Sequence, residues 1–393
     1  MGGVSMEWKE VDICQLCDSI SETYKGNASE VVLINTSDVL DGKCLNHEYV
    51  PNKKLKGQFK KTFRKGDILY SEIRPANKRF CFVDFEPKDY IASTKLMVLR
   101  AHEDVDPQYL YQILRSNDTL AQLQMLAESR SGTFPQITYS ELSNIMVSLP
   151  SQKAQKNIVS ILSSLDRKIE LNNMINADLE EMAQAIFKNW FVDFEPFKDG
   201  KFVDSELGMI PEGWKVGTLF DIAEIFDKKR KPLSGNVREK MDKIYPYYGA
   251  TSCMDYVDDY IFDGIYTLIG EDGSVVKENG LPYMQYVWGK MWVNNHAHIL
   301  QGKNGYSTEM IHALLSITNI KFLVTGAVQA KLSQGNMQKI LVAIPPKNVL
   351  DEIRPVIDNL YSKIRINTDE NSRLSLLRDT LLPRLMSGEI EIP

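Results

Sequence analysis

Two short spacings in the sequence could hold a metal ion or carry redox chemistry. Cys14 and Cys17 have the spacing of half a zinc site or of a redox pair, but no second such pair follows. His296 and His298 would place two imidazoles on one face of a strand, although a metal site needs at least a third ligand. We therefore predict that the cysteines are buried structural thiols, that the histidines are partly exposed strand residues, and that the chain binds no metal.

The sequence carries no recognisable catalytic signature. Four Gly-Lys pairs occur, but none completes the phosphate-binding loop G-x-x-x-x-G-K-[ST]. The patterns G-x-G-x-x-G, G-x-S-x-G and H-E-x-x-H are absent, and so is the Asn-Pro-Pro-aromatic tetrapeptide with which amino-methyltransferases hold a base. We expect no catalytic residues in this chain, which argues against a stand-alone methyltransferase or nuclease.

Positive charge is concentrated in two segments of the chain. The first, from Pro51 to Lys65, has seven basic residues and no acidic one, and the second lies between Lys228 and Lys243. Such runs are usually solvated surface, but two of them, one in each half of the chain and each ahead of a strand, indicate two surfaces that grip DNA phosphates. From these segments we predict that DNA contacts Lys53, Lys54, Lys60, Lys61, Arg64, Lys228, Lys229, Arg230, Lys231 and Arg238.

Neighbouring residues could read base edges. The candidates are Arg74, Lys78 and Arg79 in the first half and Tyr247 in the second. Each half also has a glycine-led loop, Ser131–Gln136 and Thr325–Lys331, which adds Gln136, Gln329 and Lys331 to the predicted DNA-binding residues. Glycine at such a place allows either a close approach to a ligand or a tight turn, and both interpretations stay open.

The elements that position these residues recur at a shift of 195 residues. Ile145–Pro150 aligns with Ile340–Pro345, and each is a short apolar strand that ends in proline. A long helix-forming stretch follows each strand, at about residues 152–191 and 348–386, with apolar residues at steps of seven except at the middle position. That step is typical of a coiled coil, so we expect the two helices to pair with each other, antiparallel.

Asparagine occupies the middle seam position of each helix, at Asn172 and Asn367. A buried asparagine at such a position fixes the register of a helix pair by bonding to another polar group. The alternative is that each faces solvent where the seam drifts. Pro355, near the start of the second helix, should kink that helix or delay its first turn.

The stretches ahead of the helices mix β-like runs with turns and one helical region each, which predicts an α/β fold used twice. The expected organisation is a globular domain at 1–150, a helix at 151–195, a linker at 196–209, a second globular domain at 210–345 and a second helix at 346–393. A length of 393 residues fits this division into two large domains.

Composition bounds the class of protein. Hydrophobic residues make up 43% and charged residues 25%, which is typical of globular chains and excludes collagenous and largely disordered ones. The formal charge of −6 does not by itself suggest a nucleic-acid partner, so the local clusters carry that prediction. Five scattered cysteines, no signal peptide and no apolar run of membrane length predict a cytoplasmic protein.

In this order and spacing, several segments closely resemble the specificity subunits of type I restriction-modification systems. The segments that carry the resemblance are Ser131–Ile137, Ile186–Phe197, Ile210–Trp214, Tyr256–Gly264 and Leu382–Ile390. The resemblance covers nearly the whole chain. One departure is that Gln155 at the start of the first helix has no glutamine counterpart at the start of the second.

The resemblance implies two target-recognition domains on two long helices, in a non-catalytic subunit that reads a split, asymmetric target in double-stranded DNA. It also implies docking of two methyltransferase subunits, with ATP-driven restriction subunits as possible further partners. S-adenosylmethionine, ATP and Mg would then be bound by those partners and not by this chain. The competing hypothesis is a coiled-coil scaffold that never touches nucleic acid.

Overall fold

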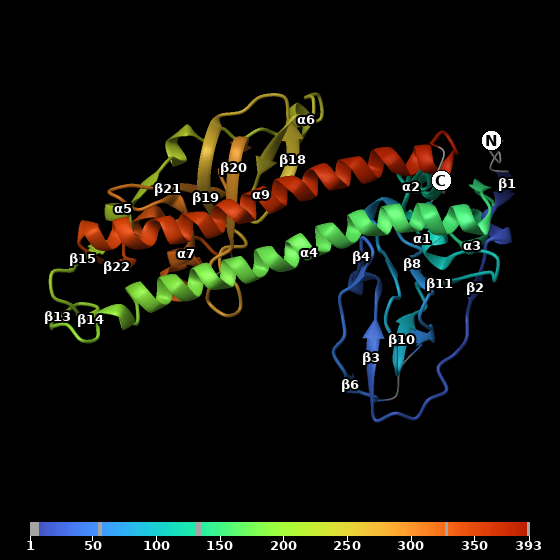
Figure 1. Cartoon of the computed structure of the whole chain (residues 1–393), viewed down its shortest axis with the longest axis horizontal. Coiled ribbons are helices and arrows are strands. Elements are labelled where there is room, and N and C mark those ends of the chain that lie inside the picture. The colour runs from blue at the N-terminus through green and yellow to red at the C-terminus, as the bar shows by residue number, and fades with distance from the viewer. Residues whose placement is uncertain (1–7, 54–56, 130–134, 327–328, 391–393) are drawn as a thin grey trace, which may run out of the picture. The chain divides into compact units, whose positions relative to one another are not determined.

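The computed structural model describes residues 8–53, 57–129, 135–326 and 329–390, which form two compact units (Figure 1). The first unit comprises Met1–Glu170 and Glu370–Pro393, and the second comprises Leu171–Asp369. The boundary falls inside both long helices, α4 (Gln152–Phe191) and α9 (Lys347–Met386). Each unit therefore contains half of each helix.

The first unit is built on two four-stranded sheets. One has the order β2–β11–β8–β9 and is antiparallel throughout, with strands Cys17–Ile20, Leu96–Ala101, Ile68–Ser71 and Phe80–Phe82. The other has the order β6–β3–β10–β7, with strands Val50–Pro51, Glu30–Ile34, Tyr90–Ser93 and Phe59–Lys61. A small hairpin, β4 (Val39–Leu40) with β5 (Lys43–Cys44), accompanies them.

The helical region expected around 107–128 is two helices, α1 (Pro107–Arg115) and α2 (Asn117–Ser129). Ser116 separates them because its backbone is extended and its Oγ accepts a hydrogen bond from the Thr119 N–H, which starts the second helix. The buried faces of both helices share one core with the long helices.

The second unit is built on a single six-stranded sheet of order β16–β21–β19–β20–β17–β18. Its strands are Ala223–Ile225, Ala297–Gly302, Phe262–Gly270, Met284–Val293, Tyr245–Tyr248 and Cys253–Val257. Helix α7 (Thr308–Ser316) packs on this sheet in an apolar core. Short elements complete the unit: β13 (Phe202–Ser205), β14 (Gly208–Pro211), α5 (Leu219–Ile222), α6 (Gly235–Arg238) and α8 (Gln334–Met337). The α/β prediction is confirmed, but the two sheet architectures differ.

Both units nevertheless share one frame around these sheets: a short helix and a two-stranded antiparallel pair whose second strand leads into the long helix. In the first, β12 (Met146–Leu149) pairs with β1 (Lys9–Asp12), and in the second, β22 (Leu341–Ile344) pairs with β15 (Lys215–Thr218), both antiparallel. A short helix precedes each closing strand, α3 (Tyr139–Ser143) and α8. Both predicted strands before the long helices are thereby confirmed.

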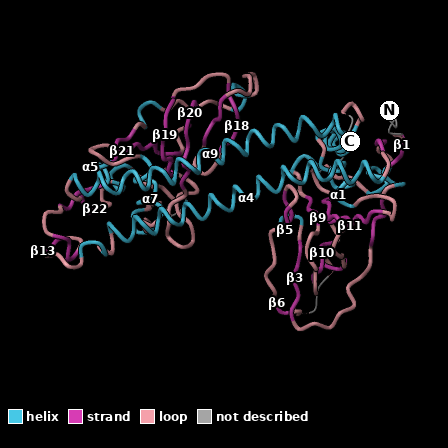
Figure 2. Tube along the Cα trace, in the orientation of Figure 1, coloured by secondary structure: helices cyan, strands magenta, loops and turns pink. Residues whose placement is uncertain are grey.

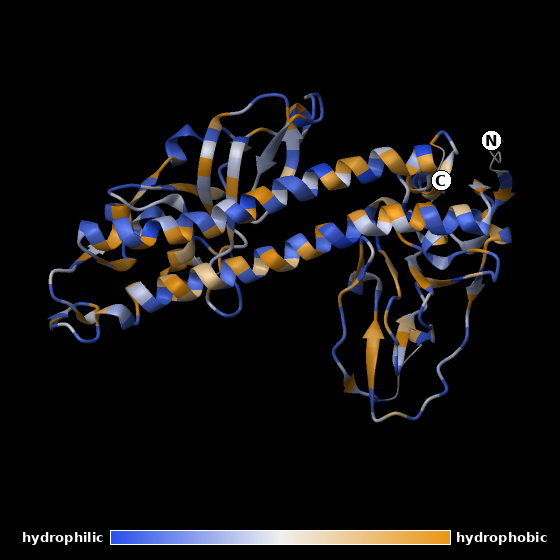
Figure 3. Cartoon of the chain, viewed as in Figure 1, coloured by the Kyte–Doolittle hydropathy of each residue, from blue (hydrophilic) through white to orange (hydrophobic). Residues whose placement is uncertain are grey.

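The two long helices match the helix-forming stretches predicted at 152–191 and 348–386 to within one residue. Figure 2 shows both as continuous. Apolar residues recur along them among hydrophilic ones (Figure 3). In the first unit, Asp166 of α4 accepts a hydrogen bond from Arg378 of α9 at 2.8 Å, and Lys168 lies 3.2 Å from Glu370. Within the second unit, Phe187 of α4 shares a core with Ile357 of α9.

Two expectations about the helices are settled by burial and position. Asn172 is 1% exposed and Asn367 is 2% exposed, so the solvent-facing alternative is wrong. The expected delay at Pro355 is wrong as well, because α9 begins eight residues earlier, at Lys347, and continues through the proline. The Pro355 ring is exposed to solvent, so it displaces no core side chain.

The departure at the helix starts has a structural reason. Buried Gln155 donates from Nε2 to the Pro150 carbonyl oxygen at 3.0 Å and accepts from the Asp106 N–H at 2.8 Å, which ties α4 to the start of α1. The residue 195 positions later is Leu350, which is buried in the apolar core of the second unit. One unit therefore fixes the start of its long helix with hydrogen bonds and the other with apolar packing.

Two predictions about the short spacings are corrected. Cys17 is buried, but Cys14 is exposed. Cys14 lies in the 3-10 turn Ile13–Gln15, which precedes β2. His296 is exposed in the turn before β21, whereas His298, inside that strand, is 1% exposed. His298 is therefore a core residue and not a partly exposed one.

Candidate nucleic-acid interface

The first basic segment is divided between the two edges of its sheet. Lys53 follows β6 at one edge, and Lys60 lies on β7 at the other, both exposed. Lys61 is already engaged, since its Nζ donates to the Leu96 carbonyl oxygen at 2.8 Å and burial lowers its pKa. Arg64 is exposed. Lys54 lies outside the described residues.

Backbone pairing between two segments brings Arg74 and Gln136 together. The Arg74 N–H donates to the Pro135 carbonyl oxygen at 3.1 Å, and Ile73 pairs with Gln136 as an isolated β-bridge. Arg74 and Lys78 flank the 3-10 turn Pro75–Asn77. Both are exposed, and both have left-handed backbone conformations, with φ values of +46° and +51°. Non-glycine residues in this region cost on the order of 1–3 kcal/mol each and are concentrated at binding sites, so the strain favours a contact role for this turn.

Arg79 is tied to the chain by its own hydrogen bonds, and most of the first glycine loop lies outside the described residues. The Arg79 Nη1 donates to the carbonyl oxygens of Ser37 and Val39 at 3.1 and 3.4 Å, which ties its guanidinium to the chain. Of the loop Ser131–Gln136, residues 131–134 lie outside the described part of the chain.

The second basic segment presents three lysines to solvent. Lys228, Lys229 and Lys231 are exposed, and the Lys229 Nζ lies 5.0 Å from the centroid of the Phe226 ring. The Trp292 indole N–H donates to the Lys231 carbonyl oxygen at 2.6 Å, and this hydrogen bond anchors the backbone of the segment. These lysines are therefore exposed charges on an anchored turn, which suits phosphate contact.

Arg230, in the middle of that segment, points into the unit. Its Nη1 lies 2.6 Å from Glu271 Oε2, its Nη2 lies 3.5 Å from Asp227 Oδ2, and its side chain is 13% exposed. The structure does not place this guanidinium where DNA could reach it. Its position between two carboxylates makes it a residue of the protein interior.

Arg238 and Tyr247 also serve the fold. Arg238 Nη1 lies 2.6 Å from Asp255 Oδ2, and its guanidinium carbon lies 4.9 Å from the Tyr247 ring centroid. Tyr247 is 2% exposed, and its hydroxyl accepts from the Leu233 N–H at 3.0 Å. The predicted base-reading role of Tyr247 is incompatible with this burial, because no base edge could reach its ring.

The second glycine loop meets the basic segment. Gln329 and Lys331 are exposed, and the Lys331 Nζ lies 3.6 Å from Glu271 Oε1, on the carboxylate that also binds Arg230. Gly326 has φ +98°, and a Cβ there would lie 2.0 Å from the Gln329 carbonyl oxygen. The turn thus accounts for the glycine. Ala327 and Val328 are outside the described residues.

Sequence reasoning missed Phe322 and the partners of His298. Phe322 is 94% exposed in the turn Lys321–Leu323, four residues before Gly326, and nothing in the local pattern distinguishes it from a core residue. Asp227 lies 2.5 Å from His298 but 71 residues away in sequence, so no spacing rule could pair them.

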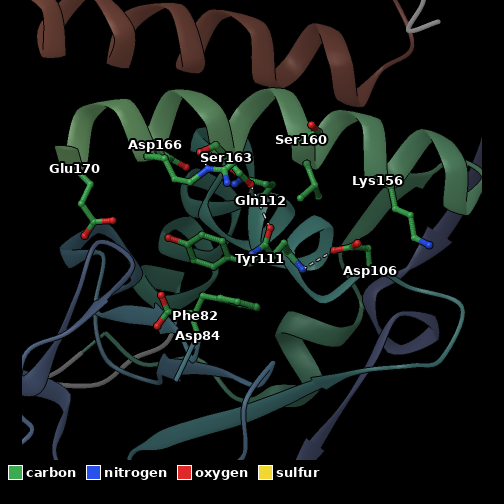
Figure 4. Close-up of a pocket in the computed structure, with 13 residues that line it drawn as sticks. Phe82, Asp84, Asp106, Tyr111, Gln112, Lys156, Ser160, Ser163, Asp166 and Glu170 are labelled. Carbon is green, nitrogen blue, oxygen red and sulfur yellow. Dashed lines mark hydrogen bonds between the residues drawn. The ribbon is translucent and has the colours of Figure 1, made fainter. Parts of the chain in front are cut away.

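The first unit also contains a polar cleft of about 420 Å³ between α1 and α4 (Figure 4). Two of its carboxylates already have partners: Asp106 accepts from the Gln108 N–H as the cap of α1, and Asp166 lies 2.9 Å from Arg115. The Ser163 hydroxyl donates to Gln108 Oε1 at 3.2 Å. None of the predicted DNA-binding residues lines this cleft.

Within the described residues, no helix is both long and apolar enough to cross a membrane.

One protein family matches this organisation, in which a repeated frame carries two different sheet architectures. The profile described as "Type I restriction modification DNA specificity domain" matches residues 6–181 and again residues 211–376. The chain belongs to this family. Each match of the type I specificity family spans one globular region and most of the long helix that follows it.

Individual relatives agree with this membership. The chain is 31% identical to the type I restriction enzyme HindI specificity subunit of Haemophilus influenzae, over 98% of this chain and 100% of that protein. It is 26% identical to the MjaIX specificity subunit of Methanocaldococcus jannaschii, over 88% and 85%. The fold is similar to the crystal structure of the type I S subunit from M. genitalium, with a TM-score of 0.54 at 16% identity over 100% and 99%.

Proposed function

We propose that this chain is the non-catalytic, DNA-reading subunit of a type I restriction-modification complex and that it reads a two-part, asymmetric target. The observation that carries the proposal is the combination of one repeated frame with two different sheet architectures, two four-stranded sheets in the first unit and one six-stranded sheet in the second. A frame used twice supports two recognition events of the same kind. Sheets of different architecture present different side chains to DNA, so the two half-sites are expected to differ in sequence.

The partners in this proposal are two methyltransferase subunits that dock on the long helices. Exposed apolar residues recur on α4 and α9 at the 195-residue shift, as Ile161 and Val356, Leu171 and Ile366, and Met182 and Leu377. Exposed apolar side chains are normal when scattered, but the same three positions on both helices indicate two similar surfaces. Two similar surfaces fit two copies of one partner.

Cofactors enter this proposal only through the partners. S-adenosylmethionine, ATP and Mg are assigned to the methyltransferase and restriction subunits, and the chain's own task is binding and spacing. The helices would set the distance between half-sites as an antiparallel coiled coil. Family membership does not favour the alternative of a scaffold without DNA.

Binding of DNA by the methyltransferase complex of this chain tests the proposal. Replacing Lys228, Lys229 and Lys231 with Ala should weaken binding and reduce its salt dependence, because fewer counterions are released. The matched control replaces Lys198, Lys201 and Lys215, three exposed lysines of the same unit, with Ala. Equal effects of the two triple variants would attribute the loss to net charge alone and contradict the assigned surface.

A further inference from the structure

His298 makes two short hydrogen bonds inside the second unit. Its Nδ1 lies 2.5 Å from Asp227 Oδ2, and its Nε2 lies 2.6 Å from the Leu332 carbonyl oxygen. The imidazole is 1% exposed, so water does not substitute for either partner. The ring is therefore held from both ends within the protein core.

Both partners of this ring are hydrogen-bond acceptors. The Leu332 carbonyl oxygen can only accept. Asp227 is also an acceptor, because the Ile299 N–H donates to its other oxygen at 3.0 Å and Arg230 lies beside it. Burial opposes ionisation of Asp227, but hydrogen bonds, led by the one from His298, hold its pKa below the usual range. The ring therefore bridges two acceptors that lie on different segments of the chain.

The charges around this ring come from four segments of the unit. Asp227 and Arg230 belong to the turn after β16, Glu271 follows β19 with its Oε2 3.7 Å from the His298 Nδ1, and Lys331 pairs with Glu271. Gln334 of α8 adds a neutral donor to Asp227 at 2.7 Å. His296 lies just before β21, the strand that contains His298, and its exposed ring contacts Asp272.

The two carboxylates and the imidazole are close enough together to suggest a metal site, but their surroundings argue against one. The guanidinium of Arg230 lies 2.6 Å from Glu271, and both ring nitrogens of His298 already have hydrogen-bond partners. Arg230 and Lys331 together balance the two carboxylates, so a divalent cation would add uncompensated charge.

The ring joins the two segments that bear the predicted DNA contacts of this unit. Asp227 directly precedes Lys228 and Lys229, and Leu332 directly follows Lys331. We propose that His298 is a positioning residue that holds the loop Gln329–Lys331 against the basic turn Lys228–Lys231. This inference rests on the proposed DNA-reading function.

The inference predicts an effect confined to one half-site. Loss of the His298 ring removes the contact to Asp227 and the contact to Leu332, so the loop and the basic turn are no longer held together. The first unit has no part in this bridge and provides an internal reference.

The test selects bound duplexes from a randomised DNA pool with the methyltransferase complex of the full chain. His298→Gln should lower enrichment of the half-site read by the second unit at least about tenfold, while the other half-site changes little. The matched control His296→Gln, in the exposed turn before β21, should behave like the wild type.

A second measurement tests the positioning role without DNA. The amides of Lys331 and Leu332 donate to the carbonyl oxygens of Thr325 and Glu271, and their hydrogen exchange in the full chain should be faster in His298→Gln than in the wild type. Unchanged exchange at these amides, or wild-type enrichment of the second half-site by His298→Gln, would overturn the inference. Failure of the wild type to enrich any sequence would instead contradict the proposed function, and the exchange rates would still decide the role of His298.

Discussion

Asn367 on α9 donates a hydrogen bond from Nδ2 to Oδ1 of Asn176 on α4, at 2.9 Å within the second unit. Asn176 in turn donates to the Thr368 hydroxyl at 3.1 Å. A polar contact of this kind in an apolar seam costs stability but penalises every other register. Register is the property that a spacer between two half-sites must keep.

Replacing Asn172 and Asn367 with Leu should therefore raise stability and loosen register. Two buried amides would be exchanged for apolar side chains, so the unfolding midpoint should rise while higher oligomers appear. Denaturation and light scattering of the purified chain check this. A monodisperse variant of unchanged stability would remove the register argument.

The long helices were predictable because a seven-residue apolar step persists over their whole length, and local pattern decides such elements. Their ends fall within one residue of prediction. The contact residues were less predictable. Tyr247 is buried, and its hydroxyl accepts a hydrogen bond from the backbone of Leu233, a contact that no local pattern indicates. The partner of His298 is Asp227, which belongs to a distant segment of the sequence.

Arg230 should be a stability residue. Its removal leaves Asp227 and Glu271 without their guanidinium, and breaking a buried ion pair costs roughly 3–5 kcal/mol. Arg230→Met should lower the free energy of unfolding of the second unit in urea by a large part of that amount. Arg230→Lys, which keeps the charge, should cost less. If Arg230→Met weakened DNA binding without any loss of stability, a direct contact role would be restored.

Asp227 should make the second unit acid-sensitive. Its folded pKa lies below the ordinary value, against the opposing effect of burial, because it accepts hydrogen bonds led by that from His298. The carboxylate therefore contributes stability above about pH 4, and this is lost as pH falls through the lowered folded pKa. Stability measured against pH should show this decline, and Asp227→Asn should flatten it. A variant with the wild-type acid slope would contradict the assignment.

The docking surfaces predict a change in stoichiometry. Met182→Glu places a charge on the exposed α4 surface and Leu377→Glu places one on the equivalent α9 surface. Each single variant should lose one methyltransferase subunit and the double variant both, as measured by the mass of the assembled complex. The control variant, which combines Lys198→Glu with Lys201→Glu in the exposed segment after α4, should keep both subunits. Retention of two subunits by the Met182→Glu, Leu377→Glu double variant would remove these helix positions from the interface.

The most direct test of the central claim is a map of methylated bases across the genome of a host that expresses this chain with its methyltransferase. We expect one asymmetric motif in two parts separated by a fixed gap, with only one part altered when residues 210–345 are exchanged for those of another family member. A single undivided motif, or a motif that this exchange leaves unchanged, would contradict the account.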